Sequence, residues 1–147
     1  MEEQKREYEF LLIRPDATME RRRGSQNGGE LQEALGGGLL EYVALDRAHA
    51  GYLDEDGKLK GFPVNPVATE LWKRLRGLPE HFPDTVNGNF LICGCLNEDG
   101  ENDGFDYTVS DEVERLAWLL CIECRIAWRE AFSKEWARTE DSYEEAE

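Results

Sequence analysis

The hydrophobic positions of this chain form short, separate runs, and their length predicts where strands occur. Apolar runs of strand length lie at residues 8–14, 39–45 and 86–96, a pattern typical of strands buried in a sheet. The first run ends at Arg14-Pro15, where the proline favours extended geometry in the residue before it. These three runs therefore predict three strands.

Two short segments carry the start and stop signals of helices. Residues 30–35 are followed by three glycines and predict a short helix that ends there. Asn65 is a favoured N-cap residue and Pro66 suits the first helical position, so a second helix is expected from Pro66 to about Arg76, ending at Gly77.

A long last helix is predicted from about Asp111 to Arg138. Ser110 can cap it, and acidic residues occupy its first turn, where the helix dipole favours negative charge. One apolar stripe follows helical spacing and comprises Val113, Leu116, Leu120, Cys124, Ala127, Ala131 and Phe132. Trp118, Ile122 and Ile126 widen this stripe beyond what one face of a sheet usually covers.

Two polar stretches predict connections. Residues 51–62 are expected to form a hairpin, because Asp56-Gly57 supplies the positive φ angles of a tight turn and residues 58–62 alternate in polarity. Arg21-Arg22-Arg23 begins a polar stretch without apolar alternation. We interpret it as a mobile surface loop in preference to a phosphate contact, because the chain as a whole is acidic.

In chain order these elements read β-α-β-β-α-β-α, which predicts an α+β fold. We expect a mostly antiparallel sheet of about four strands, covered on one face by two or three helices and ending in one long C-terminal helix. Residues 1–138 would form a single domain, and residues 139–147 an acidic, frayed tail. A hydrophobic content of 40% is sufficient for the core of such a domain.

The chain shows no signal for a membrane. The longest strongly apolar run, residues 117–122, is far shorter than the ~20 residues that cross a bilayer. Residues 1–5 are charged and lack the apolar core of a signal peptide. The expectation is therefore a cytoplasmic protein without a membrane partner.

Negative charge is concentrated in the second half of the chain. Residues 1–79 hold 14 acids against 12 bases, a net charge of −2, and residues 80–147 hold 18 against 5, a net charge of −13. Such a field attracts basic surfaces and repels nucleic acid. Residues 97–114 contain eight acids and no base. These acids are the predicted partner-binding residues: Glu98, Asp99, Glu101, Asp103, Asp106, Asp111, Glu112 and Glu114. A second acidic group comprises Glu140, Asp141, Glu144, Glu145 and Glu147.

Two candidate metal sites, one for calcium and one for zinc, can be assessed from the spacing of their ligands. Residues 99–104 match part of a calcium loop, but Ser110 stands where the bidentate Glu is required, and we favour a solvated connection. The only thiolate set for zinc is Cys93, Cys95, Cys121 and Cys124. Its Cys-x-x-Cys pair lies inside an apolar helix instead of a turn, so we expect free, packed cysteines and no cofactor.

Nothing in the chain indicates catalysis. His49 and His81 are the only histidines, and no nucleophile elbow, phosphate loop or His-Glu metal motif occurs. We therefore expect a protein that is not an enzyme.

Two segments carry a resemblance to a family. Residues 53–68, Leu-Asp-Glu-Asp-Gly-Lys-Leu-Lys-Gly-Phe-Pro-Val-Asn-Pro-Val-Ala, and residues 86–94, Val-Asn-Gly-Asn-Phe-Leu-Ile-Cys-Gly, resemble domain of unknown function 3846. The resemblance spans roughly residues 9–97 and brings no catalytic residues. It implies a phage-, plasmid- or mobile-element-borne protein that acts in a bacterial cytoplasm.

Two hypotheses about function remain open. The preferred one is an acidic binding protein that imitates nucleic acid and occupies a basic surface of a host nucleic-acid-binding protein, as an anti-restriction or anti-CRISPR inhibitor would. The alternative is a homo-oligomeric interaction module, such as a homodimer, that uses Trp118, Ile122 and Ile126 of the last helix.

Overall fold

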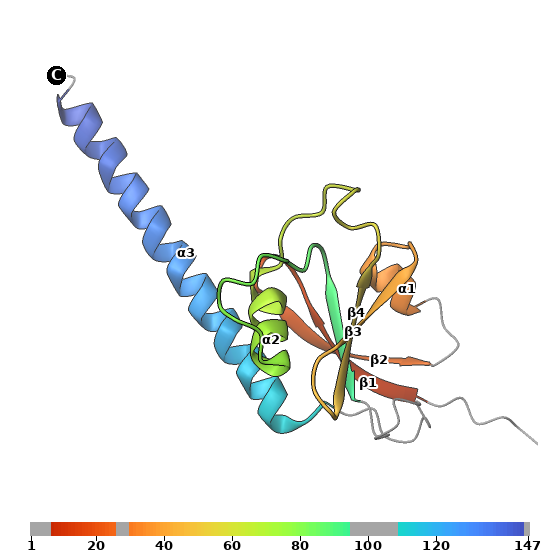
Figure 1. Cartoon of the computed structure of the whole chain (residues 1–147). Coiled ribbons are helices and arrows are strands. Elements are labelled where there is room, and N and C mark those ends of the chain that lie inside the picture. Colours follow the sequence, from red (N-terminus) through yellow and green to blue (C-terminus); the bar gives the residue numbers. More distant parts are fainter. Residues whose placement is uncertain (1–6, 26–29, 95–108, 146–147) are drawn as a thin grey trace, which may run out of the picture.

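The computed structural model describes residues 7–25, 30–94 and 109–145, which form an α+β fold (Figure 1). The strands form one antiparallel sheet in the order β2-β1-β5-β4-β3. The strands are β1 (Glu7–Ile13), β2 (Met19–Ser25), β3 (Leu40–Ala44), β4 (His49–Asp54) and β5 (Phe90–Gly94). The helices are α1 (Glu30–Leu35), α2 (Pro66–Arg76) and α3 (Asp111–Glu145).

Helices cover both faces of the sheet, whereas the sequence predicted cover on one face. Leu11, Phe90 and Ile92 point to the face on which α2 and α3 pack, and they belong to the larger core cluster. Leu12 and Leu91, whose side chains point the other way, join Leu35 of α1 in a second cluster. Residues 10–13 of β1 and residues 90–93 of β5 are apolar at consecutive positions because both faces of these strands are covered.

The prediction of a loop at Arg21-Arg22-Arg23 was wrong, and the strand count was therefore four instead of five. These arginines lie in β2, which pairs with β1 along its whole length, from Glu7 opposite Ser25 to Ile13 opposite Met19. At the sheet edge β2 buries little, so it lacks the apolar alternation that marks a strand. Charged side chains on an edge strand also discourage pairing with other chains.

The predicted hairpin at residues 51–62 was also wrong. The hairpin is formed by β3 and β4, with Leu40 opposite Asp54 and Ala44 opposite Ala50. Residues 55–61 form successive turns, closed by backbone hydrogen bonds such as Phe62 N–H to Gly57 O at 2.9 Å. The Asp-Gly signal thus marks a turn correctly, but the chain leaves the sheet after it.

The prediction for α2 is confirmed at both ends. Asn65 has extended geometry, and its side-chain oxygen accepts a hydrogen bond from Ala68 N–H at 3.0 Å. Gly77 ends the helix in the left-handed conformation, with φ of 71°, a conformation that glycine adopts without steric cost. The short α1 and the strand run at residues 39–45 are confirmed as well.

Helix α3 begins at the predicted residue and runs on to Glu145, so residues 139–145 are helical. Among the described side chains of α3, those that pack on the larger core cluster lie in its first turns: Val113, Ala117, Leu120 and Cys121 are buried, and Leu116 and Cys124 are partly buried. Every described side chain from Arg125 to Trp136 is exposed. Figure 1 shows the rest of the helix extending far beyond α2 and the sheet. Within the described residues, no helix has the length and apolarity that crossing a membrane requires.

Candidate functional site

The exposed side of α3 carries seven of the eleven large hydrophobic residues that are exposed in the described part of the chain. We call this set the α3 apolar face; it comprises Trp118, Leu119, Ile122, Ile126, Trp128, Phe132 and Trp136. Their exposed fractions run from 43% for Trp118 to 66% for Phe132. Phe132 and Trp136 share one side of the helix, with stacked rings whose centroids are 6.5 Å apart. Exposed apolar residues in such number mark an interaction surface.

The buried stripe predicted for α3 ends earlier than expected. Leu116 and Cys124 are partly buried against the core, as the spacing indicated, but Ala127, Ala131 and Phe132 are exposed. The helix has left the sheet by the point at which those residues occur. Periodicity alone does not reveal where a helix leaves its domain, because the pattern continues beyond that point.

The two segments that carry the family resemblance lie against each other. Asn65 is fully buried, and its side-chain N–H groups donate to Ile13 O at 3.0 Å and to Gly88 O at 2.9 Å. Asn87 donates to Phe62 O at 3.0 Å. Residues 53–68 and 86–94 therefore form one hydrogen-bonded junction, which joins the start of α2 to the ends of β1 and β5.

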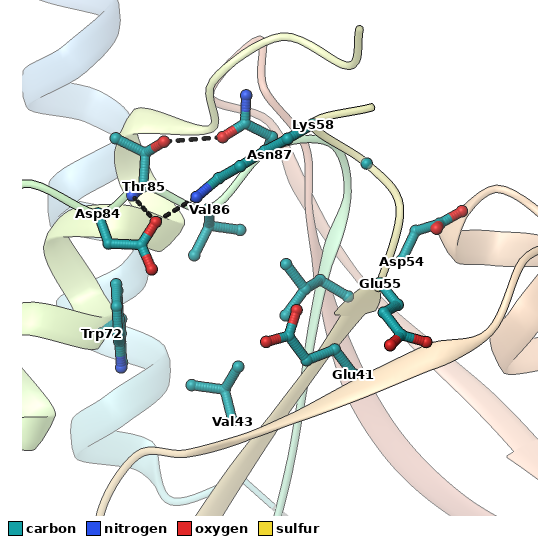
Figure 2. A pocket seen from close by; sticks show the side chains of 12 residues that line it. Glu41, Val43, Asp54, Glu55, Lys58, Trp72, Asp84, Thr85, Val86 and Asn87 are labelled. Atoms are coloured by element: carbon teal, nitrogen blue, oxygen red, sulfur yellow. Dashed lines mark hydrogen bonds and ion pairs between the residues drawn. The ribbon is translucent and has the colours of Figure 1, made fainter. Parts of the chain in front are cut away.

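A cavity of about 120 Å³ lies beside this junction (Figure 2). Val43, Trp72 and Val86 supply apolar walls, and Figure 2 shows the carboxylates of Glu41 and Asp84 on opposite sides of the opening. Acidic groups outnumber basic ones in the lining, since Glu41, Asp54, Glu55 and Asp84 accompany Lys58.

Two of these carboxylates are already paired with lysines. Asp84 is ion-paired with Lys58, and the hydrogen bond from Lys58 lowers the pKa of Asp84. Asp54 is buried and accepts a hydrogen bond from Lys60 at 2.6 Å, which lowers its pKa. No group of three or more metal-ligating side chains occurs among the described residues. Two of the four carboxylates that line this cavity are therefore held in ion pairs with lysines.

His49, which the sequence did not single out, connects the sheet to the start of α3. It is 4% exposed, and its Nε2 accepts the backbone N–H of Ser110 at 3.0 Å. Nδ1 therefore carries the proton and donates to Asp46 at 2.8 Å. Ser110 in turn caps α3, with its Oγ 3.3 Å from Val113 N. No sequence motif signals this contact, because His49 and Ser110 are 61 residues apart.

Of the eight predicted partner-binding acids, the structure describes three. Asp111 and Glu112 are exposed in the first turn of α3. Glu114 is half-buried and accepts a hydrogen bond from Arg21 Nε at 2.8 Å, and this arginine lowers the pKa of Glu114. Five lie outside the described residues: Glu98, Asp99, Glu101, Asp103 and Asp106.

The cysteines are divided between the two core clusters. Cys93 lies in the cluster on the α1 side of the sheet, and Cys121 lies in the cluster on the opposite side. Burial raises the pKa of the Cys121 and Cys124 thiols. Cys95 lies outside the described residues. The sheet therefore separates Cys93 from the α3 pair, which opposes a shared zinc site.

The fold and site define an α+β domain with an appended, projecting helix. The family model for a domain of unknown function (DUF3846) matches residues 8–116, and the chain belongs to this family. The matched region includes the sheet, α1, α2 and the first turns of α3, and it stops before the projecting part of the helix. No curated protein and no solved structure matches the chain.

Proposed function

We propose that this protein is a non-catalytic interaction module that forms a homodimer through the α3 apolar face. The observation that carries the proposal is the projecting part of α3, whose described side chains from Arg125 to Trp136 are all exposed and include large apolar ones. Helices in proteins gain most of their stability from packing an apolar face. A second copy supplies that packing, since it offers the same self-complementary surface.

The length of the projecting segment suits this role. Residues 125–145 rise about 30 Å along the helix axis, at ~1.5 Å per residue. Ile126, Trp128, Phe132 and Trp136 lie within this segment. Trp118 and Ile122 belong to the part that packs on the domain, yet both are 43% exposed and extend the surface toward the sheet.

Replacing Phe132 and Trp136 together with glutamine is expected to convert the dimer into a monomer. The wild-type protein should show twice the 16.9 kDa chain mass at tens of micromolar, and the variant the mass of one chain. Both side chains are exposed, so the domain core is unaffected. Light scattering coupled to size-exclusion chromatography measures the masses.

Leu59→Gln provides the matched control, because Leu59 is 88% exposed in the turns after β4 and lies outside α3. This variant should keep the mass of the wild type. A wild-type protein that remains a monomer at these concentrations contradicts the proposal.

A second candidate function is the acidic inhibitor that imitates nucleic acid. The observation that favours it is the start of α3, where His49 fixes Ser110 beside exposed Asp111 and Glu112. This point follows directly on residues 95–108, which contain five acids and no base. The partner would be a basic surface of a host restriction or CRISPR enzyme, in keeping with a mobile-element protein of the bacterial cytoplasm, without direct binding to nucleic acid.

Changing Asp103, Asp106, Asp111 and Glu112 to the corresponding amides tests this candidate. Folding should change little, since first-turn charges contribute only ~0.3–1 kcal/mol each. Binding to a basic partner, recovered from bacterial lysate at low salt and lost at high salt, should weaken at least about tenfold. Amide variants that bind every such partner as tightly as wild type would exclude the acidic surface as the binding site.

A further inference from the structure

We propose that the two α3 helices of the dimer run antiparallel, with Phe132 of each copy against the partner's Trp136. This inference rests on the proposed dimer and adds its orientation and register. It follows from the spacing of the residues along α3 and from the sign of the charges among them.

The projecting helix presents a stripe with the spacing of a coiled-coil seam. From Trp118, steps of four and three residues reach Ile122, Arg125, Arg129, Phe132 and Trp136 in turn. This alternation places the positions on one side of a helix, as the a and d positions of a heptad. The stacking of Phe132 on Trp136 agrees with a shared side.

The two arginines in the stripe decide the orientation. In a parallel pair in register, each stripe residue faces its own copy, so Arg125 would meet the partner's Arg125 and Arg129 the partner's Arg129. The helix end, whose sequence contains Glu140, Asp141 and Glu144, would likewise run beside its own copy. Like charges that face each other across a helix pair destabilise it.

An antiparallel pair replaces these repulsions with attractions. With the twofold axis at residue 134, position 132 lies opposite 136, position 129 opposite 139, and position 125 opposite 143. The chain segment that contains Glu140, Asp141 and Glu144 then runs beside the partner's Arg125 and Arg129. Opposed helix dipoles add to the preference.

The apolar area is sufficient for a specific contact. Trp128, Phe132 and Trp136 are 45–66% exposed, and each aromatic side chain carries ~150–250 Å². Together with Ile126 and the apolar stems of the two arginines, two copies bury on the order of 1,000 Å², the lower limit for a specific interface.

Changing Arg125 and Arg129 together to glutamine gives effects of opposite sign in the two orientations. In the antiparallel dimer the change removes attraction to the acidic end, and the dimer Kd should rise at least about fourfold, from ~0.2–1 kcal/mol for each of the four symmetric exposed pairs. In a parallel dimer it relieves repulsion, and the Kd should fall. Sedimentation equilibrium over a concentration series measures the Kd, and Arg76→Gln on α2 serves as the control that leaves it unchanged.

A distance measurement reports the orientation directly. Spin labels are attached to a cysteine introduced by Ser133→Cys or by Ser142→Cys. The parent of both variants has Cys95 and Cys124 replaced by serine. In the antiparallel register, labels at Ser133 lie within about 10–15 Å of each other and labels at Ser142 about 25 Å apart or more, at ~1.5 Å rise per residue. Short distances at both positions, or a fall in Kd for the arginine variant, would overturn the orientation while the dimer stands. A wild-type chain that is monomeric would overturn the dimer itself.

Discussion

Replacing Asn65 with alanine is expected to destabilise the protein by about 3 kcal/mol or more. The side chain is fully buried and makes three hydrogen bonds, as a donor to Ile13 O and Gly88 O and as an acceptor from Ala68 N–H. Loss of a helix cap costs ~0.5–2 kcal/mol, and each buried polar group that loses its partner costs ~1–3 kcal/mol. Urea unfolding, compared with wild type, measures the loss.

Two further variants test the origin of this effect. Asn65→Asp retains an oxygen that caps α2 but loses both N–H donors, so it should remain strongly destabilised because the carboxylate faces two carbonyl oxygens. Glu70→Ala lies on the same helix, where its partly exposed side chain pairs with Arg74, and should cost no more than ~0.5 kcal/mol. An Asn65→Ala protein as stable as the Glu70→Ala protein would show that the junction contributes little.

Replacing Gly51 with alanine is expected to cost about 2–3 kcal/mol or more, although the change adds a single methyl group. A Cβ at residue 51 would lie 2.6 Å from Cε2 and 2.8 Å from Cε1 of Phe90, and closer still to Cζ. Phe90 is fully buried in the larger core cluster, so any movement of its ring disturbs neighbouring core side chains. Thermal or urea unfolding measures the cost.

Shortening the opposing ring should recover part of the loss. In the double variant Gly51→Ala/Phe90→Leu, the leucine leaves the space that the new methyl group needs. The double variant should therefore be more stable than the sum of the two single changes indicates, by ~1 kcal/mol or more. Strict additivity would show that the methyl group and the ring do not compete for space.

Local signals predicted the parts of the fold that local chemistry determines. Asn65-Pro66 and Gly77 fix α2 because capping depends on residues within one turn of the helix ends. The β1 and β5 runs are recognisable because both of their faces are buried. The family resemblance located the two segments that meet at the junction, but their hydrogen bonds emerge only from the fold.

Strand β2 shows why the rest could not be predicted. Two of its three arginines are held by residues on other elements: Arg21 pairs with Glu9 and with Glu114, and Arg23 with Glu9. Arg21 and Glu114 are 93 residues apart. A strand stabilised by such pairs lacks the alternation that sequence reasoning requires. The extent of the α3 apolar face depended likewise on where the helix leaves the sheet.

The described contacts of α3 with the domain lie near its start, so a small tilt there moves its far end by a large distance. Its described anchors all lie near its start: the buried residues Val113, Ala117, Leu120 and Cys121, the ion pair of Glu114 with Arg21, and the hydrogen bond between Ser110 and His49. The whole helix of 35 residues is about 50 Å long at ~1.5 Å per residue, so a tilt of about 10° at its base displaces its far end by about 9 Å. A small rotation of α3 about these anchors would therefore displace its far end by a much larger distance than its base.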